Sequence, residues 1–158
     1  MTRILGIDPG LTNLGWAVIE SSGSARKYIA SGVIKPPSAA ASPMHSRLKF
    51  IFDAVAALCE TWSPNECAIE IIFVNKNPKT TLILGHARAA AIVAIANADI
   101  VIFEYEPNKI KKAIACAGHA DKTAIARMVK MLLPMATPKT TDESDAIAIA
   151  LAHSNIRR

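Results

Sequence analysis

The sequence has 158 residues, of which 51% are hydrophobic and 20% are charged. These values exclude a disordered chain and favour a single globular domain over 1–158, long enough to bury a sizeable core. The formal net charge of +5 at pH 7 suggests a polyanionic partner such as nucleic acid, although solubility alone also explains a basic chain.

The amino terminus and the cysteines bear on localisation. The apolar run in MTRILGID is too short for a signal peptide, and the long run AAAIVAIANADIVIF is interrupted by Asn97 and Asp99. The cysteines Cys59, Cys67 and Cys116 form no C-x-x-C pair, and the histidines lack zinc-binding spacing. We therefore expect a cytoplasmic protein without a membrane span, in which oxygen atoms would hold any metal.

The first third of the chain predicts strands followed by a helix. Three β-rich runs at 3–7, 14–20 and 27–34 are separated by the turn signals DPGLTN and SSGSA, which predicts three consecutive antiparallel strands. Apolar residues recur with helical spacing from Leu48 to Leu58, after a proline-containing loop. This segment therefore predicts an amphipathic helix.

The rest of the chain alternates strands and helices. Strands are expected over 67–74 and 100–105, and helices over 80–98, 108–115, 122–133 and 143–153. This order predicts an α/β fold with a mixed five-stranded sheet, three antiparallel strands followed by parallel additions, flanked by helices.

Two acidic residues are expected to meet at the carboxyl edge of this sheet. A right-handed crossover lays 67–74 parallel to one of the first three strands, and beside the first strand it would bring Asp8 next to Glu70. Glu70 lies inside an apolar strand, where an ionised carboxylate needs a partner or a cation. Alternatively, Asp8 begins a turn in DPG for local reasons, and Glu70 is a strand-end residue paired with a lysine.

Two more carboxylates, Asp142 and Asp145, lie three residues apart at the start of an apolar helix. Thr140 and Glu143 match a capping box, which explains an acidic first turn but does not explain Asp145. Four carboxylates that converged without cations would raise at least one pKa steeply. We therefore predict a shared site for two magnesium or manganese ions, suited to displacement at a phosphodiester.

The excess of positive over negative charge lies entirely in the second half of the chain. Up to Asn75 six Lys or Arg residues balance six Asp or Glu residues, whereas from Lys76 onward there are twelve against seven. Asp142 and Asp145 lie in this basic half. A basic surface around carboxylates is typical of a site that brings a polyanion to a cation.

Several ordered motifs give the chain a family resemblance. GIDPG followed by LGWAV, then AIEIIFVNKNPKTTLILGHARAAAI, IKKAIACAGHADK and DESDAIAIALAH resemble the RuvC-type Holliday-junction resolvases, of ribonuclease-H-like fold, over nearly the whole chain. The resemblance implies that Asp8, Glu70, Asp142 and Asp145 are the metal-binding catalytic quartet. It also implies magnesium dependence, a homodimer, a branch-migration helicase complex as partner, and symmetric nicking of four-way DNA junctions in recombination and repair.

Four further positions match residues that the family uses to hold DNA. Phe73 matches an aromatic beside the unpaired bases at the junction centre, where stacking contributes about 1 to 3 kcal/mol. Lys76, Lys111 and Lys122 match basic positions that face the DNA backbone. The alternatives are a core phenylalanine and ordinary solvated lysines.

The chain also departs from the family pattern. Cys116 replaces the first glycine of a G-x-G before the basic loop, Ala89 replaces the glycine of ARG, and Ile71 replaces an acidic or amide residue. Losing a glycine removes a freely adopted positive φ, so we expect a change in junction affinity more than in chemistry.

The helix LILGHARAAAIVAIA is apolar nearly all round, so it must be covered on more than one side. We expect the face with Ala87, Ala90, Ala91 and Ala94 to meet a second copy, unless other helices of the same chain cover it. Two other functions share this fold: a junction-binding structural protein with little cleavage, and a ribonuclease-H-like nuclease acting on other nucleic acids.

Overall fold

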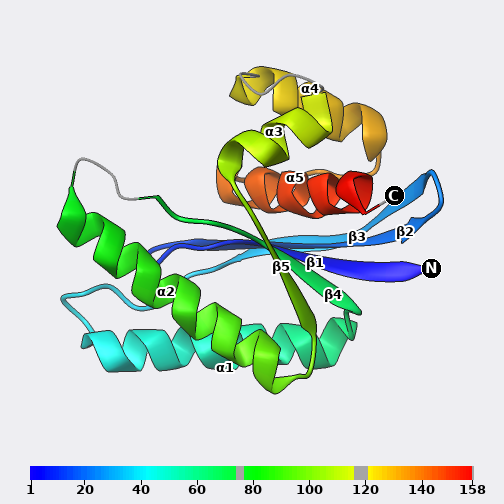
Figure 1. Cartoon of the computed structure of the whole chain (residues 1–158). Coiled ribbons are helices and arrows are strands. Elements are labelled where there is room, and N and C mark those ends of the chain that lie inside the picture. Colours follow the sequence, from blue (N-terminus) through cyan, green and yellow to red (C-terminus); the bar gives the residue numbers. More distant parts are fainter. Residues whose placement is uncertain (74–76, 116–120, 158) are drawn as a thin grey trace.

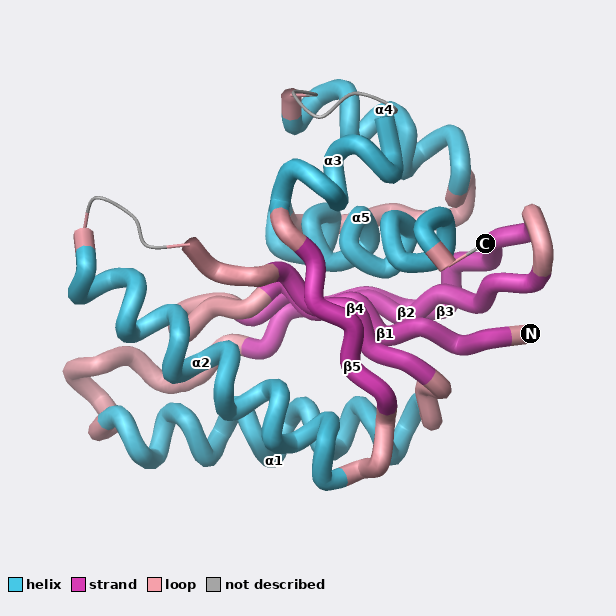
Figure 2. The backbone as a smooth tube through the Cα atoms, in the orientation of Figure 1, coloured by secondary structure: helices cyan, strands magenta, loops and turns pink. Residues whose placement is uncertain are grey.

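A five-stranded sheet lies between two layers of helices in the computed structural model, which describes residues 1–73, 77–115 and 121–157 (Figures 1 and 2). The strands are β1 (Thr2–Asp8), β2 (Leu14–Ser22), β3 (Ala25–Ile34), β4 (Glu66–Glu70) and β5 (Val101–Tyr105). Helices α1 (Met44–Trp62) and α2 (Pro78–Asn97) cover one face, and α3 (Pro107–Ala115), α4 (Lys122–Leu132) and α5 (Thr141–Ile156) lie over the other.

The predicted topology is confirmed. The strand order is β3-β2-β1-β4-β5, with β1, β2 and β3 antiparallel and with β4 and β5 added in parallel. Ile7 pairs with Ile69, so Asp8 and Glu70 are the next residues along neighbouring strands. The carboxyl ends of β1 and β4 therefore bring these two acids to one edge of the sheet, as predicted.

The predicted length of β4 is wrong, because the strand ends at Glu70 and not at residue 74. Its neighbour β5 ends at Tyr105, which pairs with Glu70, and the Ile71 amide donates to the Tyr105 carbonyl at 2.8 Å. Beyond this bond the chain leaves the sheet, because α3 begins at Pro107. Glu70 is therefore a strand-end residue at the rim of the sheet, and not an interior one.

Side-chain alternation divides the core into two halves. Leu5 and Ile7 belong to the cluster on the α1 and α2 side, whereas Ile4 belongs to the cluster around α5. Residues two apart on a strand share a face, so Asp8 follows Ile4 toward α5. Glu70 lies on the same face as Ala68, which also packs in the α5 cluster. Both acids are thus on the side of the sheet where α5 begins.

Two glycines let α5 lie directly on the sheet. A Cβ atom on Gly6 would overlap the carbonyl oxygen of Ala146 and come within 2.9 Å of the Ala150 Cβ, and one on Gly15 would overlap the Asp142 carbonyl oxygen. Above α5 lie α3 and α4 (Figure 1). Covered from both sides, α5 is buried continuously from Ala146 to Ser154.

Helix α2 contradicts the predicted alanine interface. Ala87, Ala91 and Ala94 are buried within this chain, where α2 packs against α1. The exposed side carries instead Leu82, 64% exposed, and Val93, 57% exposed. Small side chains let two helix backbones approach closely, and here the partner backbone is α1. By length and composition alone, α2 is also apolar enough to span a bilayer, and it is the one such helix among the described residues.

Candidate active site

Three of the four predicted carboxylates line one cleft at the carboxyl edge of the sheet. Asp8 ends β1, Glu70 ends β4, and Asp145 lies in the second turn of α5 above them. The cleft has a volume of about 240 Å³. The rest of its wall is formed by Pro107, Ile110, Lys111, Ile125, Ala148 and Ile149. The structure therefore brings these three carboxylates together as the sequence predicted.

Asp142 lines a second, neighbouring hollow, and Asp8 lines both this hollow and the cleft. This hollow is lined by Asp8 and Asp142, the loop 9–13 and three residues of α2. Asp8 pairs with Gly15 across β1 and β2, and the Asp142 backbone lies directly against Gly15. The four carboxylates are thus grouped around Asp8, which lines both hollows.

The first turn of α5 is fixed by polar contacts on both of its sides. The Thr140 hydroxyl accepts from the Glu143 amide at 3.2 Å, which confirms Thr140 as the N-cap. The Glu143 carboxylate accepts from the Ser31 hydroxyl at 2.9 Å, and Ser31 in turn bonds Tyr28 at 2.9 Å. Glu143 therefore ties the turn that carries Asp142 to β3, a contact that the capping motif did not predict.

Two arginines that the sequence did not single out hold backbone near the acids. Arg88 of α2 donates from Nε to the Glu70 carbonyl at 2.9 Å and pairs with Glu104. The buried Arg47 donates to the Leu11 carbonyl at 3.1 Å, in the loop that follows Asp8. Each guanidinium bonds a main-chain oxygen, so neither leaves a motif that residue spacing could reveal.

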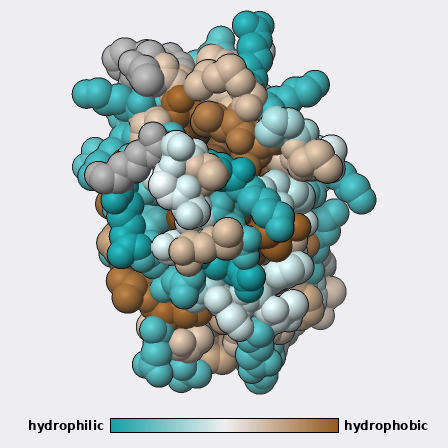
Figure 3. All heavy atoms as spheres, turned by 90° about the vertical axis from the view of Figure 1, so that its right-hand side faces the viewer, coloured by the Kyte–Doolittle hydropathy of each residue, from teal (hydrophilic) through white to brown (hydrophobic). Residues whose placement is uncertain are grey.

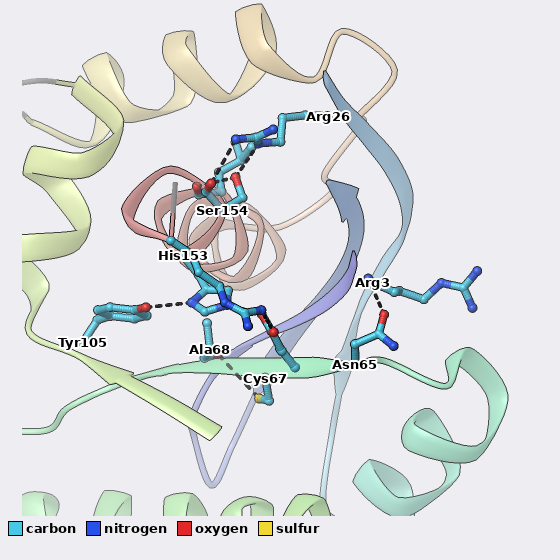
Figure 4. Close-up of polar contacts among 11 residues, drawn as sticks. Arg3, Arg26, Asn65, Cys67, Ala68, Tyr105, His153 and Ser154 are labelled. Carbon is cyan, nitrogen blue, oxygen red and sulfur yellow. Dashed lines mark hydrogen bonds and ion pairs between the residues drawn. The ribbon is translucent and has the colours of Figure 1, made fainter. Parts of the chain in front are cut away.

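A buried polar chain connects Tyr105 of β5, His153 of α5 and Glu66 of β4, and Figure 4 shows its contact between Tyr105 and His153. The Tyr105 hydroxyl lies 2.7 Å from His153 Nδ1, and His153 Nε2 lies 2.8 Å from a Glu66 carboxylate oxygen. Arg157 also pairs with Glu66. Burial lowers the pKa of His153 and raises the pKa of Tyr105. A neutral imidazole suits this geometry, since one ring nitrogen accepts from tyrosine while the other donates to carboxylate.

The predicted DNA-binding residues are only partly described. Lys111 lines the cleft beside Asp8 and Glu70. Phe73 is 54% exposed, so the alternative of a core phenylalanine is wrong. Lys76 and the side chain of Lys122 lie outside the described residues.

The carboxylates suit a hard divalent cation in their chemistry. The acidic side chains that line the cleft, Asp8, Glu70 and Asp145, supply carboxylate oxygens, which are the ligand type that magnesium and manganese prefer. In the described part of the chain, no three His, Cys, Asp or Glu side chains are already close enough to hold a metal. Asp8, Glu70, Asp142 and Asp145 would hold the cation once their side chains turn toward it.

Comparisons with known proteins agree on one family. The family "Crossover junction endodeoxyribonuclease RuvC" matches residues 4–153. Proteins of that name from Bradyrhizobium diazoefficiens and Caulobacter vibrioides are 46% and 45% identical over 156 residues, covering 99% of this chain and 88% and 91% of theirs. The solved structure "T. thermophilus RuvC in complex with Holliday junction substrate" has a TM-score of 0.93 and 29% identity, covering 100% of this chain and 96% of its own.

Proposed function

Because the chain belongs to the RuvC family of crossover junction endodeoxyribonucleases, it is a Holliday-junction resolvase, and we propose that Asp8, Glu70, Asp142 and Asp145 form its active site. The observation that carries this proposal is the cleft that Asp8, Glu70 and Asp145 line together. Asp142 joins them through the hollow that it shares with Asp8.

The family requires a divalent metal, and we assign two magnesium ions to this quartet, with manganese as a substitute. When bound, such ions activate water and neutralise charge on a phosphate. The chain contributes the rigid frame: β1 and β4 hold Asp8 and Glu70 on neighbouring strands, and α5 holds Asp142 and Asp145 above them. Because the main chain that carries these ligands is fixed, only their side chains have to turn when they bind a metal.

Among the described residues, Lys111 is the basic residue best placed to meet the scissile phosphate, because it lines the same cleft as three of the acids. Phe73, exposed just beyond Glu70, is assigned to stacking on a base at the junction centre. Lys76 and Lys122 complete the proposed DNA contacts. Replacing Lys111 by Ala should flatten the salt dependence of junction binding, by about 0.9 in the log-log slope.

A homodimer is the proposed assembly, and the outer face of α2 is its proposed interface. This face surrounds a shallow hollow lined by Ile71, Ile72, Gly85, Arg88, Ala89, Ile92 and Val93, among others. An exposed apolar patch of this kind is typical of a protein interface. A two-fold dimer would set two identical sites opposite equivalent strands of a four-way junction, which accounts for symmetric nicking.

The chain is a non-membrane protein by family, so we assign the apolar side of α2 to a second copy and not to lipid. We place the enzyme in the cytoplasm, with a branch-migration helicase complex as its partner. Its role is resolution of junctions during recombination and DNA repair.

A gel assay of nicking tests the proposal directly. A labelled four-way junction should be cut at two related positions with magnesium and left intact without it, while linear duplex and DNA–RNA hybrid are cut poorly. Equal cutting of the hybrid would indicate a ribonuclease-H-like activity. Tight junction binding with no cutting in any divalent metal would indicate a structural junction-binding protein and overturn the proposed chemistry.

A further inference from the structure

We propose that His153 is a positioning residue, which sets where α5 holds Asp142 and Asp145 over Glu70. The inference rests on the proposed active site, because it explains how the two halves of that site keep their spacing. His153 does not line the cleft, and none of its described contacts is with the four acids. Its effect is therefore transmitted through the strands that it bonds.

The two partners of His153 belong to the strands around Glu70. Glu66 is on the same strand as Glu70 and on the same face, four residues earlier. Tyr105 pairs with Glu70 on the adjacent strand, and its carbonyl accepts from the Ile71 amide. Through two hydrogen bonds of 2.7 and 2.8 Å, His153 thus connects α5 to both strands that position Glu70.

Matching distances along α5 and β4 explain how the hydrogen bond between His153 and Glu66 aligns Asp145 with Glu70. His153 is eight residues after Asp145, which is about 12 Å along a helix. Glu66 is four residues before Glu70, which is about 13 Å along a strand. Helix α5 starts at the edge where β4 ends, so the two elements run in opposite directions (Figure 1). Placing His153 over Glu66 therefore places Asp145 over Glu70.

Burial makes this connection rigid. His153 is 0% exposed, and Glu66 and Tyr105 are each 6% exposed, so both hydrogen bonds are largely shielded from water. Glu66 also pairs with Arg157, one residue after the end of α5. Glu66 and Arg157 also line a hollow on the face of the molecule seen in Figure 3. Hydrophilic side chains gather across the middle of this face.

A neighbouring residue supplies a matched control. Ser154 follows His153 on the same buried turn, and its hydroxyl accepts from Arg26 Nε of β3 at 2.6 Å (Figure 4). Replacing Ser154 by Ala removes the local bond from its hydroxyl to the Leu151 carbonyl and the part-buried hydrogen bond with Arg26 that docks the same end of α5. That bond leads to β3, at the far edge of the sheet from β4 and β5. Ser154→Ala therefore tests the docking of α5 in general and leaves the bonds to β4 and β5 in place.

The experiment measures manganese binding to the full-length protein by calorimetry without DNA. Tyr105→Phe, which keeps the ring and removes only the hydroxyl, and His153→Gln should each weaken manganese binding about tenfold. The double variant should be no weaker than the poorer single variant, because both changes break one connection. Ser154→Ala should bind manganese like the wild type, and metal-free junction affinity should be unchanged in all four proteins.

Two outcomes would overturn the inference. One is wild-type manganese affinity in Tyr105→Phe. This result would overturn the inference even if His153→Gln failed to fold. The other is an equal loss in Ser154→Ala, which would reduce His153 to general docking of α5. A Glu70→Gln variant separates this from the proposed function: if it binds manganese like the wild type, the quartet itself is wrong.

Discussion

Helices α5 and α2 are alike in sequence and differ in what covers them. Both are apolar nearly all round, and neither has a polar stripe that tells the inside from the outside. In α5 ten residues are buried, because the sheet covers one side and α3 and α4 cover the other. In α2 four residues are buried, and Leu82 and Val93 remain exposed. An apolar helix thus needs two covering layers, and this chain supplies only one for α2.

The difference assigns the two helices different tasks. Helix α5 is fixed on every side, so it can hold Asp142 and Asp145 still relative to the strands. Helix α2 keeps an apolar side that a second copy of the chain can cover. The same composition therefore gives a rigid support for chemistry in one place and an interface in the other.

The largest effect is expected where α5 meets the cleft. Asp145→Asn should lower single-turnover cleavage of a four-way junction about a thousandfold, because bound metals contribute several kcal/mol to the transition state. Junction affinity measured without metal should stay within about twofold, since it rests on phosphate contacts. The control is Asp53→Asn, which changes an exposed carboxylate of α1 that pairs with Lys49 and lines no part of the cleft, and it should cut normally. Near wild-type cutting by Asp145→Asn would remove the helix pair from the proposed active site.

A pair of glycine substitutions contrasts the packing of the two helices. In Gly6→Ala the new methyl group would overlap the Ala146 carbonyl of α5, so the free energy of unfolding should fall by about 1 to 3 kcal/mol. In Gly85→Ala nothing lies within 4 Å of the new methyl, and α2 should gain up to about 1 kcal/mol from helix propensity. Urea denaturation measures both. A tolerated Gly6→Ala would mean that α5 does not press on the sheet.

Charges placed on the two sides of α2 separate its interface from its core. Val93→Glu, on the exposed side, should weaken dimerisation at least tenfold and leave the melting temperature of the monomer nearly unchanged. Ala94→Glu, buried against α1, should instead unfold the chain, because a buried unpaired charge costs several kcal/mol. Analytical ultracentrifugation and thermal melting distinguish the two. A dimer that survives Val93→Glu would place the interface elsewhere.

The sequence predicted the features that follow from residue patterns within one element and from the handedness of a crossover. The crossover rule predicted Asp8 beside Glu70 if β4 lies next to β1, and the structure has that pairing. Helical spacing predicted Asp142 and Asp145 on one side of a helix, and each lines a hollow that Asp8 also lines. The length of β4 was mispredicted because it depends on where β5 ends, which is a property of the partner strand.

Two further features were beyond local patterns. The inward side of α2 could not be chosen, since both of its sides are apolar and only the fold decides which one meets α1. The bond between His153 and Glu66 joins residues 87 apart in the chain, and neither belongs to a spacing motif. Its one signal was a histidine in an otherwise apolar buried helix, which implies a polar partner without naming it.

The smallest effect concerns the acid stability of α5. Burial lowers the pKa of His153 from its ordinary value of 6.5, so the unfolded chain binds a proton that the folded chain refuses. This contribution to stability is complete above the unfolded pKa and is lost as the pH falls below it, at up to about 1.4 kcal/mol per pH unit. The pairing of Glu66 with Arg157 works in the same direction, because a carboxylate already neutralised attracts the imidazolium less. Urea titrations between pH 7 and pH 5 should therefore show a steeper loss of unfolding free energy in the wild type than in His153→Gln. Parallel pH profiles for the two proteins would mean that His153 takes up its proton without opening the helix, and that α5 is held less tightly than its burial indicates.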